Sequence, residues 1–168
     1  MSTINKINKL SQSEFIEVFA NIFENAIWIA EKLYEQKPFD DLKHLSYKIL
    51  DIFENASKEN QLKILNAHPD LANKTKIYLL TPDSKKEQSN AGLDQCSEEE
   101  FNEFNNLNYK YKKKFGFPFI YAVMGKSKME ILSNFRKRVL CDIDVEFVEA
   151  KKQVKKIASL RINELMKK

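Results

Sequence analysis

Residues 97–116, SEEEFNEFNNLNYKYKKKFG, contain a start signal, an apolar stripe and a stop signal for one long helix. Ser97 and Glu100 form a capping-box pattern, in which the side chain of each residue bonds the backbone N–H of the other. The apolar side chains that follow recur at helical spacing and are Phe101, Phe104, Leu107, Tyr111 and Phe115. Gly116 stands where the helix is expected to end, because glycine adopts the backbone conformation of a helix C-terminus without strain. The stretch therefore predicts an amphipathic helix that packs one face into a core.

The same periodicity occurs in the first third of the chain. Ser11 and Glu14 form another capping-box pattern ahead of an apolar stripe. That stripe comprises Phe15, Val18, Phe19, Ile22 and Phe23, and continues through Ile27, Ala30, Leu33 and Tyr34 until Pro38 interrupts it. A further stripe comprises Leu42, Leu45, Ile49, Ile52 and Phe53. Both stripes predict helices.

The middle of the chain predicts two more helices and a connector. Ser57 is expected to open a short helix through Leu62 and Leu65, which must end near His68 because Pro69 disfavours helical geometry at the residue before it. Residues 70–83 are predicted to be a connector with a partly ordered centre at 77–80. Ser84 and Glu87 then form a capping-box pattern that predicts the start of the next helix.

The last third predicts two helices after a short apolar run. Residues 117–124, FPFIYAVM, are continuously apolar and too few for a typical helix, so they predict either a buried extended segment or one or two tight helical turns. Ser127 and Glu130 form a capping-box pattern ahead of the next helix. The last helix is expected to begin at 142–144 and to run nearly to the C-terminus.

Length and glycine content bound the fold class. The chain has 168 residues, which suits one domain with a sizeable core. It contains 3 glycines, a small share against the usual ~7%. So few glycines argue against a dinucleotide-binding fold, a phosphate-binding loop and a β-sandwich. We therefore predict an all-α protein in which residues 1–168 form a single compact bundle-like domain of about seven to nine helices.

Charge and cysteine content narrow the function classes. Lys and Arg total 28 against 24 acidic residues, a net charge of +4 that is spread over many short stretches. The basic cluster at 110–114 suggests a nucleic-acid surface, but its lysines lie where the predicted helix has its solvated face, so we expect no nucleic-acid partner. Cys96 and Cys141 are too few for a disulfide framework, which favours a reducing, cytoplasmic environment. No apolar run is long enough to cross a membrane, and no cysteine or histidine spacing suggests a metal site.

His68 is one of two histidines and the stronger candidate for chemistry. His44 lies on an amphipathic helix and is expected to be a partly exposed helix residue. His68 lies at a predicted helix end, directly before Pro69. An imidazole there could act in proton transfer, because histidine titrates near neutral pH, or could cap the last helix carbonyls. His68-Pro69-Asp70 also spells the tripeptide of J-domain co-chaperones, but the residues around it do not match that domain.

Two further residues are candidates for ligand binding. Glu87 is either the capping partner of Ser84 or, with Gln88 and Ser89, part of a first helical turn whose backbone N–H groups hold a ligand. Arg161 shares the apolar face of the last helix with Ile157. An inward guanidinium needs a partner, which is either a planar polar ligand or an internal carboxylate.

Four separated segments together resemble a known enzyme family. They are 68–72 (HPDLA), 87–94 (EQSNAGLD), 115–120 (FGFPFI) and 157–162 (IASLRI). In order and separation they are similar to the 2-oxo-4-hydroxy-4-carboxy-5-ureidoimidazoline (OHCU) decarboxylases, which act on the route from urate to (S)-allantoin. The resemblance extends from the first helix to Arg161. It implies an all-helical, cofactor-independent decarboxylase that is usually a homodimer.

The resemblance also implies roles for particular residues. By the family pattern His68 is the catalytic acid/base, Glu87 assists it and binds substrate, and Arg161 holds a polar or anionic part of the ligand. The remaining residues that it assigns to the substrate pocket are Pro69, Ser84, Lys85, Lys86, Gln88, Phe119, Ile120, Tyr121, Ala122 and Val123.

Two departures from the family pattern keep alternatives open. Met124 stands where relatives often carry a basic residue, and Tyr121 is bulkier than the usual aliphatic side chain. These differences leave open a non-catalytic or substrate-shifted relative that binds a ureido or heterocyclic ligand. A decarboxylase of a related ureido acid and a nucleic-acid-associated domain also stay open. The chain ends in Leu165-Met166-Lys167-Lys168 rather than in a peroxisomal tripeptide, which favours a cytoplasmic location.

Overall fold

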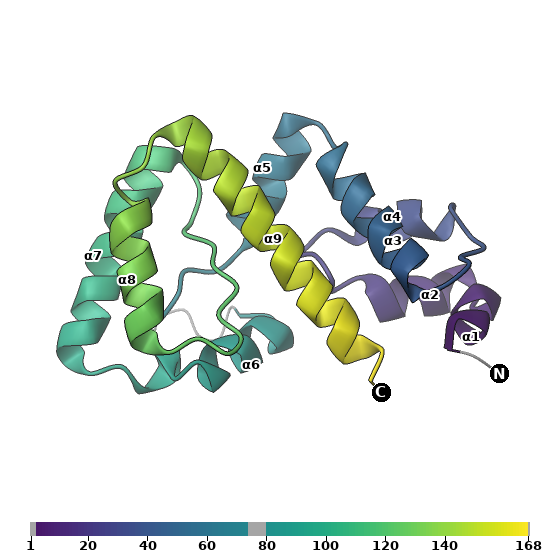
Figure 1. Ribbon diagram of the computed structural model, residues 1–168, viewed down its shortest axis with the longest axis horizontal. Coiled ribbons are helices and arrows are strands. Elements are labelled where there is room, and N and C mark those ends of the chain that lie inside the picture. The colour runs from purple at the N-terminus through teal and green to yellow at the C-terminus, as the bar shows by residue number, and fades with distance from the viewer. Residues whose placement is uncertain (1–2, 74–79, 168) are drawn as a thin grey trace. The chain divides into compact units, whose positions relative to one another are not determined.

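A computed structural model describes residues 3–73 and 80–167, and all regular secondary structure in these ranges is helical (Figure 1). The elements are α1 (Thr3–Lys9), α2 (Gln12–Phe19), α3 (Ile27–Tyr34), α4 (Leu42–Glu54), α5 (Lys58–Ala67), α6 (Pro82–Asn90), the short 3₁₀ helix η2 (Leu93–Gln95), α7 (Glu98–Phe115), α8 (Lys128–Arg138) and α9 (Ile143–Leu165). The prediction of an all-α fold with seven to nine helices is confirmed for the described residues.

The contacts divide the chain into two compact units. Unit 1 comprises residues 1–64 and 155–168, and unit 2 comprises residues 65–154. Two helices, α5 and α9, each continue from one unit into the other. Every cavity discussed below lies within unit 2, and the organisation of the whole chain as a single domain stays a prediction.

Unit 1 begins with the predicted capping box, but its apolar stripe is interrupted. Ser11 and Glu14 exchange the two capping bonds at the start of α2, as predicted. The helix ends at Phe19, and the intervening turn contains Asn25 in a left-handed conformation (φ 50°) before α3 begins. This break changes which side chains face inward. Val18, near the end of α2, and Ile27, the first residue of α3, are exposed, and their assignment to the buried stripe was wrong.

The rest of unit 1 follows the sequence pattern. Asp41 caps α4 by accepting the backbone N–H of His44, and the helix buries the predicted side chains Leu45, Ile49, Ile52 and Phe53. Ser57 accepts the backbone N–H of Asn60 at the start of α5. The His44 side chain is partly exposed, in agreement with its prediction as an ordinary helix residue.

Unit 2 is built around α7 and α8, which lie side by side (Figure 1). The predicted capping box of Ser97 and Glu100 starts α7, and Gly116 ends it with φ 78°. A second predicted capping box, of Ser127 and Glu130, starts α8. The inward-facing residues of α7 and α8 include Phe104, Leu107, Tyr111, Phe115 and Phe135, all buried. Capping at both ends and this apolar face make α7 a rigid element of the unit.

Helix α6 begins three residues before the predicted position. Thr81 is the N-cap and accepts the backbone N–H of Ser84, and Pro82 occupies the first helical turn. Proline is favourable there because its missing N–H would have no partner in a helix anyway. Ser84 therefore lies inside the helix, and the predicted capping box of Ser84 and Glu87 was wrong. Of the predicted ordered centre of the connector, residues 77–79 lie outside the described residues.

Residues 117–123 form the buried extended segment that was one of the two predicted alternatives, and Met124, the last residue of the predicted run, is exposed in the turn that follows. No helix is present between Phe117 and Val123, and Phe117, Phe119, Ile120, Ala122 and Val123 are buried. Among the helices described, none is long and apolar enough to span a bilayer.

Candidate active site

His68 lies immediately after the last residue of α5. Its backbone N–H donates to the carbonyl of Leu65 at 3.2 Å, which closes the last turn of the helix. Pro69 follows and prevents continuation of the helix. The residue is 8% exposed, so its imidazole is largely removed from solvent. The helix end and the following proline restrict the backbone of His68, so the imidazole projects from a fixed point, which suits a defined role in proton transfer.

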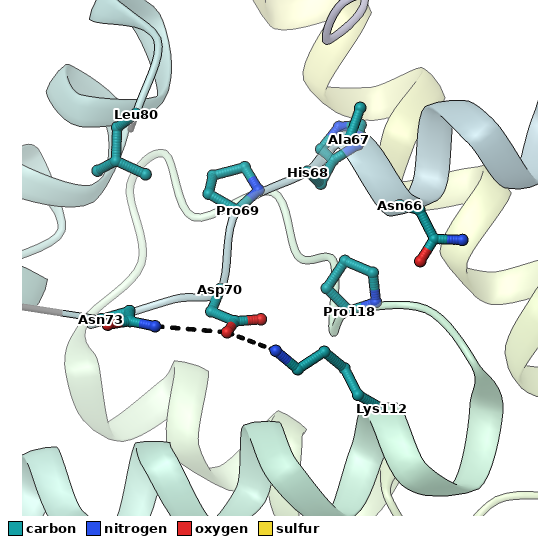
Figure 2. A pocket seen from close by; sticks show the side chains of 9 residues that line it. All are labelled: Asn66, Ala67, His68, Pro69, Asp70, Asn73, Leu80, Lys112 and Pro118. Atoms are coloured by element: carbon teal, nitrogen blue, oxygen red, sulfur yellow. Dashed lines mark hydrogen bonds and ion pairs between the residues drawn. The ribbon is translucent and has the colours of Figure 1, made fainter. Parts of the chain in front are cut away.

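A cavity of about 300 Å³ opens beside His68, and Figure 2 shows the side chains around it. It is lined by Asn66, Ala67, His68, Pro69, Asp70, Asn73, Leu80, Lys112 and Pro118. Its volume lies at the lower end of the range typical of small-molecule sites, roughly 300–1,000 Å³. The lining combines apolar rings with amide, carboxylate, ammonium and imidazole groups. This mixture fits a small, hydrogen-bond-rich ligand rather than an apolar one.

An ion pair crosses one wall of this cavity. The Lys112 ammonium lies 2.7 Å from Asp70 Oδ2, and Asn73 Nδ2 donates to the same oxygen at 3.4 Å (Figure 2). The Asp70 side chain is 11% exposed and that of Lys112 is 42% exposed. Lys112 belongs to the basic cluster at 110–114, whose lysines are exposed on α7. Sequence reasoning singled out neither Asp70 nor Lys112 as a site residue.

Two side-chain amides hold the turn that follows His68 and Pro69. From α6, Gln88 Nε2 donates to the Asp70 carbonyl at 3.3 Å, and Gln88 Oε1 accepts the Ala72 N–H at 3.0 Å. From α7, Asn108 Nδ2 donates to the Leu71 carbonyl at 3.0 Å. Both amides are buried. Gln88 was predicted to bind substrate, and both ends of its amide bond the backbone of this turn.

The other predicted residues of α6 differ in exposure. Ser84 is buried, Glu87 is partly buried, and Lys85 and Lys86 are exposed. A second cavity, of about 110 Å³, is lined by Ala72, Asn73, Leu80, Lys85, Gln88, Ser89, Leu93 and Asp94. Asn73, Leu80 and the turn held by Gln88 thus connect the His68 cavity with α6. Of the predicted α6 residues, Lys85 and Gln88 line this second cavity.

The N-cap of α6 gives a first test of this arrangement. Replacing Thr81 with Ala removes the oxygen that accepts the Ser84 N–H, so the first turn of α6 is expected to fray. The free energy of unfolding should fall by about 1 kcal/mol, as is typical for a lost N-cap. Urea denaturation followed by circular dichroism measures the loss. Thr81→Ser keeps the capping oxygen and should be close to the original protein, and equal losses in both variants would contradict the assignment.

The extended segment at 119–123, predicted to bind substrate, is anchored by two side chains of unit 2. Arg138 Nη1 donates to the Ile120 carbonyl at 2.7 Å, and Gln153 Oε1 accepts the Ala122 N–H at 3.0 Å. Tyr121 is the partly exposed residue between these two buried neighbours. Pro118, next to this segment, lines the His68 cavity. The backbone of the segment is therefore held in a defined shape close to that cavity.

Arg138 is itself part of a buried charged cluster with Glu146 and Tyr111. Glu146 Oε1 accepts hydrogen bonds from Arg138, at 2.8 Å from Nε, and from the Tyr111 hydroxyl. The Arg138 guanidinium also lies 4.6 Å from the centre of the Phe119 ring. Burial and the bond to Glu146 raise the pKa of the Tyr111 phenol well above its ordinary value, so Tyr111 stays a neutral donor. The cluster therefore ties α7, α8 and α9 to the extended segment.

Arg161 forms an ion pair with an internal carboxylate, which is one of the two alternatives given for it in the sequence analysis. Within unit 1, its Nη2 lies 2.9 Å from Glu24 Oε1, and its Nη1 donates to the Asn21 carbonyl at 3.1 Å. The side chains of both charged residues are buried. This pairing satisfies part of the guanidinium fork, and the ligand-binding role of Arg161 stays a prediction.

Within residues 3–73 and 80–167, no group of three or more histidine, cysteine or acidic side chains is arranged to hold a metal ion. Neither Cys96 nor Cys141 forms a disulfide within the described residues.

Sequence reasoning identified His68 and Pro69 but not the residues that surround them. Asp70 lay inside a quoted motif, yet its partner Lys112 is 42 positions away. Asn108 lies next to Leu107 in the apolar stripe of α7 and is buried. A polar residue within an apolar stripe could have indicated a structural or functional role. Fold and site together define an all-helical protein with a buried histidine beside a small polar cavity.

Comparison with known proteins identifies the family to which the chain belongs. The family model for OHCU decarboxylase matches residues 8–163. A 2-oxo-4-hydroxy-4-carboxy-5-ureidoimidazoline decarboxylase from Haloferax volcanii is 35% identical over 162 residues, covering 96% of this chain and 95% of the relative. The chain therefore belongs to the OHCU decarboxylase family.

One longer relative and two solved structures are consistent with membership of this family. A uric acid degradation bifunctional protein from Bacillus sp. (strain TB-90) is 39% identical over 167 residues, which is 99% of this chain and 33% of that protein. A crystal structure of OHCU decarboxylase in the presence of (S)-allantoin matches with a TM-score of 0.74 and 27% identity, covering 89% of this chain and 97% of the other. A crystal structure of (S)-allantoin synthase matches with a TM-score of 0.78 and 27% identity, covering 98% and 54%. This chain spans a third of the bifunctional relative and about half of the synthase chain.

Proposed function

We propose that this chain is a cofactor-independent carboxy-lyase that converts 2-oxo-4-hydroxy-4-carboxy-5-ureidoimidazoline to (S)-allantoin in urate catabolism. The observation that carries the proposal is His68, buried at the end of α5 and lining a polar cavity of about 300 Å³. Membership of the OHCU decarboxylase family supports the reaction, and the neighbour solved in the presence of (S)-allantoin supports the product.

The proposed chemistry needs no electron sink from the protein. The departing carboxylate is attached to a carbon next to an oxidised, electron-withdrawing ring carbon. As the C–C bond breaks and CO₂ leaves, its electron pair forms a C=C bond to that neighbouring carbon, whose C=N electrons move to the ring nitrogen, and the nitrogen takes a proton from solvent. The hydroxyl then loses its proton and becomes a carbonyl, and the electron pair of the C=C bond takes a proton at the neighbouring carbon. His68, polarised by Glu87, takes the hydroxyl proton and delivers a proton to one face of the neighbouring carbon. General acid–base catalysis of this kind contributes typically ~10²–10⁴-fold.

Orientation of the substrate supplies the rest of the rate enhancement. We propose that Pro69, residues 84–88 of α6 and the segment 119–123 bind the ring and its ureido group, as the family pattern implies. All of these residues and His68 belong to unit 2. The polar side chains of α6 suit a flat heterocycle rich in hydrogen-bonding groups. The anchoring of Ile120 and Ala122 supports a segment that keeps its shape when the ligand binds.

The direct test is turnover of freshly generated substrate. Urate is oxidised and its oxidation product is hydrolysed enzymatically in the presence of the protein, which generates the unstable substrate, and the loss of that substrate is followed by absorbance. We expect decay at least 100-fold faster than the spontaneous reaction at micromolar enzyme. Decay at the spontaneous rate, together with tight binding of (S)-allantoin, would instead favour a non-catalytic relative. Turnover of a related ureido acid alone would favour a shifted substrate.

Two substitutions distinguish a ligand-binding role of Arg161 from a purely structural role in its ion pair. Arg161→Lys keeps the charge but loses the planar fork, so it should raise KM by at least about tenfold if the guanidinium binds substrate. Glu24→Gln is the matched control, because it breaks the same ion pair from the other side. It should lower the melting temperature and leave KM within about threefold. Equal KM values for both variants would show that Arg161 is only structural.

The oligomeric state and the cellular location are further parts of the proposal. We propose a homodimer, as the family resemblance implies, and sedimentation velocity would show twice the 19.7 kDa chain mass. Four exposed apolar residues, one between α8 and α9 and three in the first two turns of α9, support an interaction surface in unit 2: Leu140, Ile143, Val145 and Val148. We propose a reducing, cytoplasmic location, because the chain has two cysteines, too few for a disulfide framework.

A further inference from the structure

We propose that Asn108 is a positioning residue for His68. Its side-chain amide fixes the turn that follows His68 and Pro69, and so determines where the imidazole lies in the cavity. The proposal rests on the proposed function in one respect, namely that His68 carries the chemistry.

The turn at residues 70–72 depends on side chains from other helices. Ala72 adopts a left-handed conformation (φ 55°), which costs free energy for a residue with a Cβ. Pro69 has no N–H to donate, so it cannot hold the turn through that atom. Gln88 supplies two bonds to the turn, and Asn108 supplies the bond to its middle carbonyl, that of Leu71. Loss of the Asn108 bond would therefore loosen the turn at its centre.

Asn108 differs from Gln88 in the element that carries it. It lies in the middle of α7, an 18-residue helix with a capping box at one end and a left-handed glycine at the other. Its neighbours on that helix, Leu107 and Tyr111, are packed in the core of unit 2. The bond to Leu71 thus connects a long helix that is capped at both ends to a carbonyl three residues after His68.

The Asn108 amide makes this bond at a cost. It is 4% exposed, and its Oδ1 atom is buried with no hydrogen-bond partner among the described residues. An unpartnered buried oxygen is unfavourable, so a side chain that only filled space at this position would be apolar. The donor bond to Leu71 is the contact that the amide makes and an apolar side chain could not.

The test replaces the donor with an acceptor of nearly the same shape. Asn108→Asp places a carboxylate against the Leu71 carbonyl, which should displace the turn. We expect kcat to fall by about 10- to 100-fold, the loss expected when a catalytic group is misplaced by ~1 Å, with KM within about threefold. Asn134→Asp on α8 is the matched control, because Asn134 also has a buried oxygen without a partner in the described part of the chain. It should keep kcat within about twofold.

A second measurement reads the position of His68 without turnover. The chain has two histidines, so the imidazole region of the proton NMR spectrum contains two sets of ring signals, assigned by their loss in His68→Asn. Asn108→Asp should shift the His68 signals and leave those of His44, in unit 1, unchanged. If Asn108→Asp does not fold, Asn108→Leu is measured in the same way.

The outcomes separate this proposal from the proposed function. An inactive original protein would contradict the proposed function, and the NMR comparison would still decide the role of Asn108. His68 signals that move no more in Asn108→Asp than in Asn134→Asp would overturn the positioning role. An unchanged kcat in a folded Asn108 variant of an active enzyme would overturn it as well.

Discussion

His68→Asn is expected to lower kcat by about 10²–10⁴-fold while the chain keeps its helical structure. Asparagine matches part of the shape of the imidazole but cannot exchange a proton near neutral pH, so the general acid–base contribution is lost. Substrate orientation by the other residues remains, which is why KM should change little. Stopped-flow absorbance of the freshly generated substrate measures kcat, and far-ultraviolet circular dichroism confirms the fold.

His44→Asn is the matched control for this variant. His44 is the other histidine of the chain and lies in unit 1, partly exposed and paired with Asp40 at 3.0 Å. Its replacement should leave kcat within about twofold. Retention of more than a tenth of the activity in His68→Asn would remove His68 from the chemistry.

Arg138→Met is expected to produce the largest loss of stability. The variant leaves the carboxylate of Glu146 fully buried without its cation and removes the bond to the Ile120 carbonyl. Breaking a buried ion pair from one side costs about 3–5 kcal/mol, because the remaining charge is uncompensated. Urea unfolding followed by circular dichroism should show a loss of this size.

Two residues earlier on the same helix, Arg136 provides the comparison. Its side chain is 51% exposed, and it forms a two-bond ion pair with Glu103 at 2.6 and 2.8 Å. Water screens such a pair, so Arg136→Met should cost less than about 1 kcal/mol. Similar losses for Arg136→Met and Arg138→Met would contradict the structural role given to the buried cluster.

Local signals in the sequence were sufficient for most helices. The capping boxes at Ser11, Ser97 and Ser127 and the stop at Gly116 involve residues no more than four positions apart, and all four were predicted correctly. Two local signals competed at α6. Thr81 followed by Pro82 is a stronger start than Ser84 with Glu87, because proline at the first turn costs no hydrogen bond.

The surroundings of His68 could not be predicted in this way. Asp70 meets Lys112, and Leu71 meets Asn108, through separations of 42 and 37 residues. These pairings depend on how α7 packs against the turn, and no local pattern in the sequence determines that packing. The partner of Arg161 is Glu24, 137 positions away, so the alternative of an internal ion pair could be stated but not assigned.

The measurement that tests the central claim most directly is the handedness of the product. Urate is oxidised enzymatically in the presence of the protein, and circular dichroism follows the optical activity of the allantoin that forms. We predict rapid growth of the (S)-allantoin signal with the original chain and its loss with His68→Asn, because the imidazole delivers the proton to one face. Allantoin that forms only at the spontaneous rate and without optical activity would contradict the account.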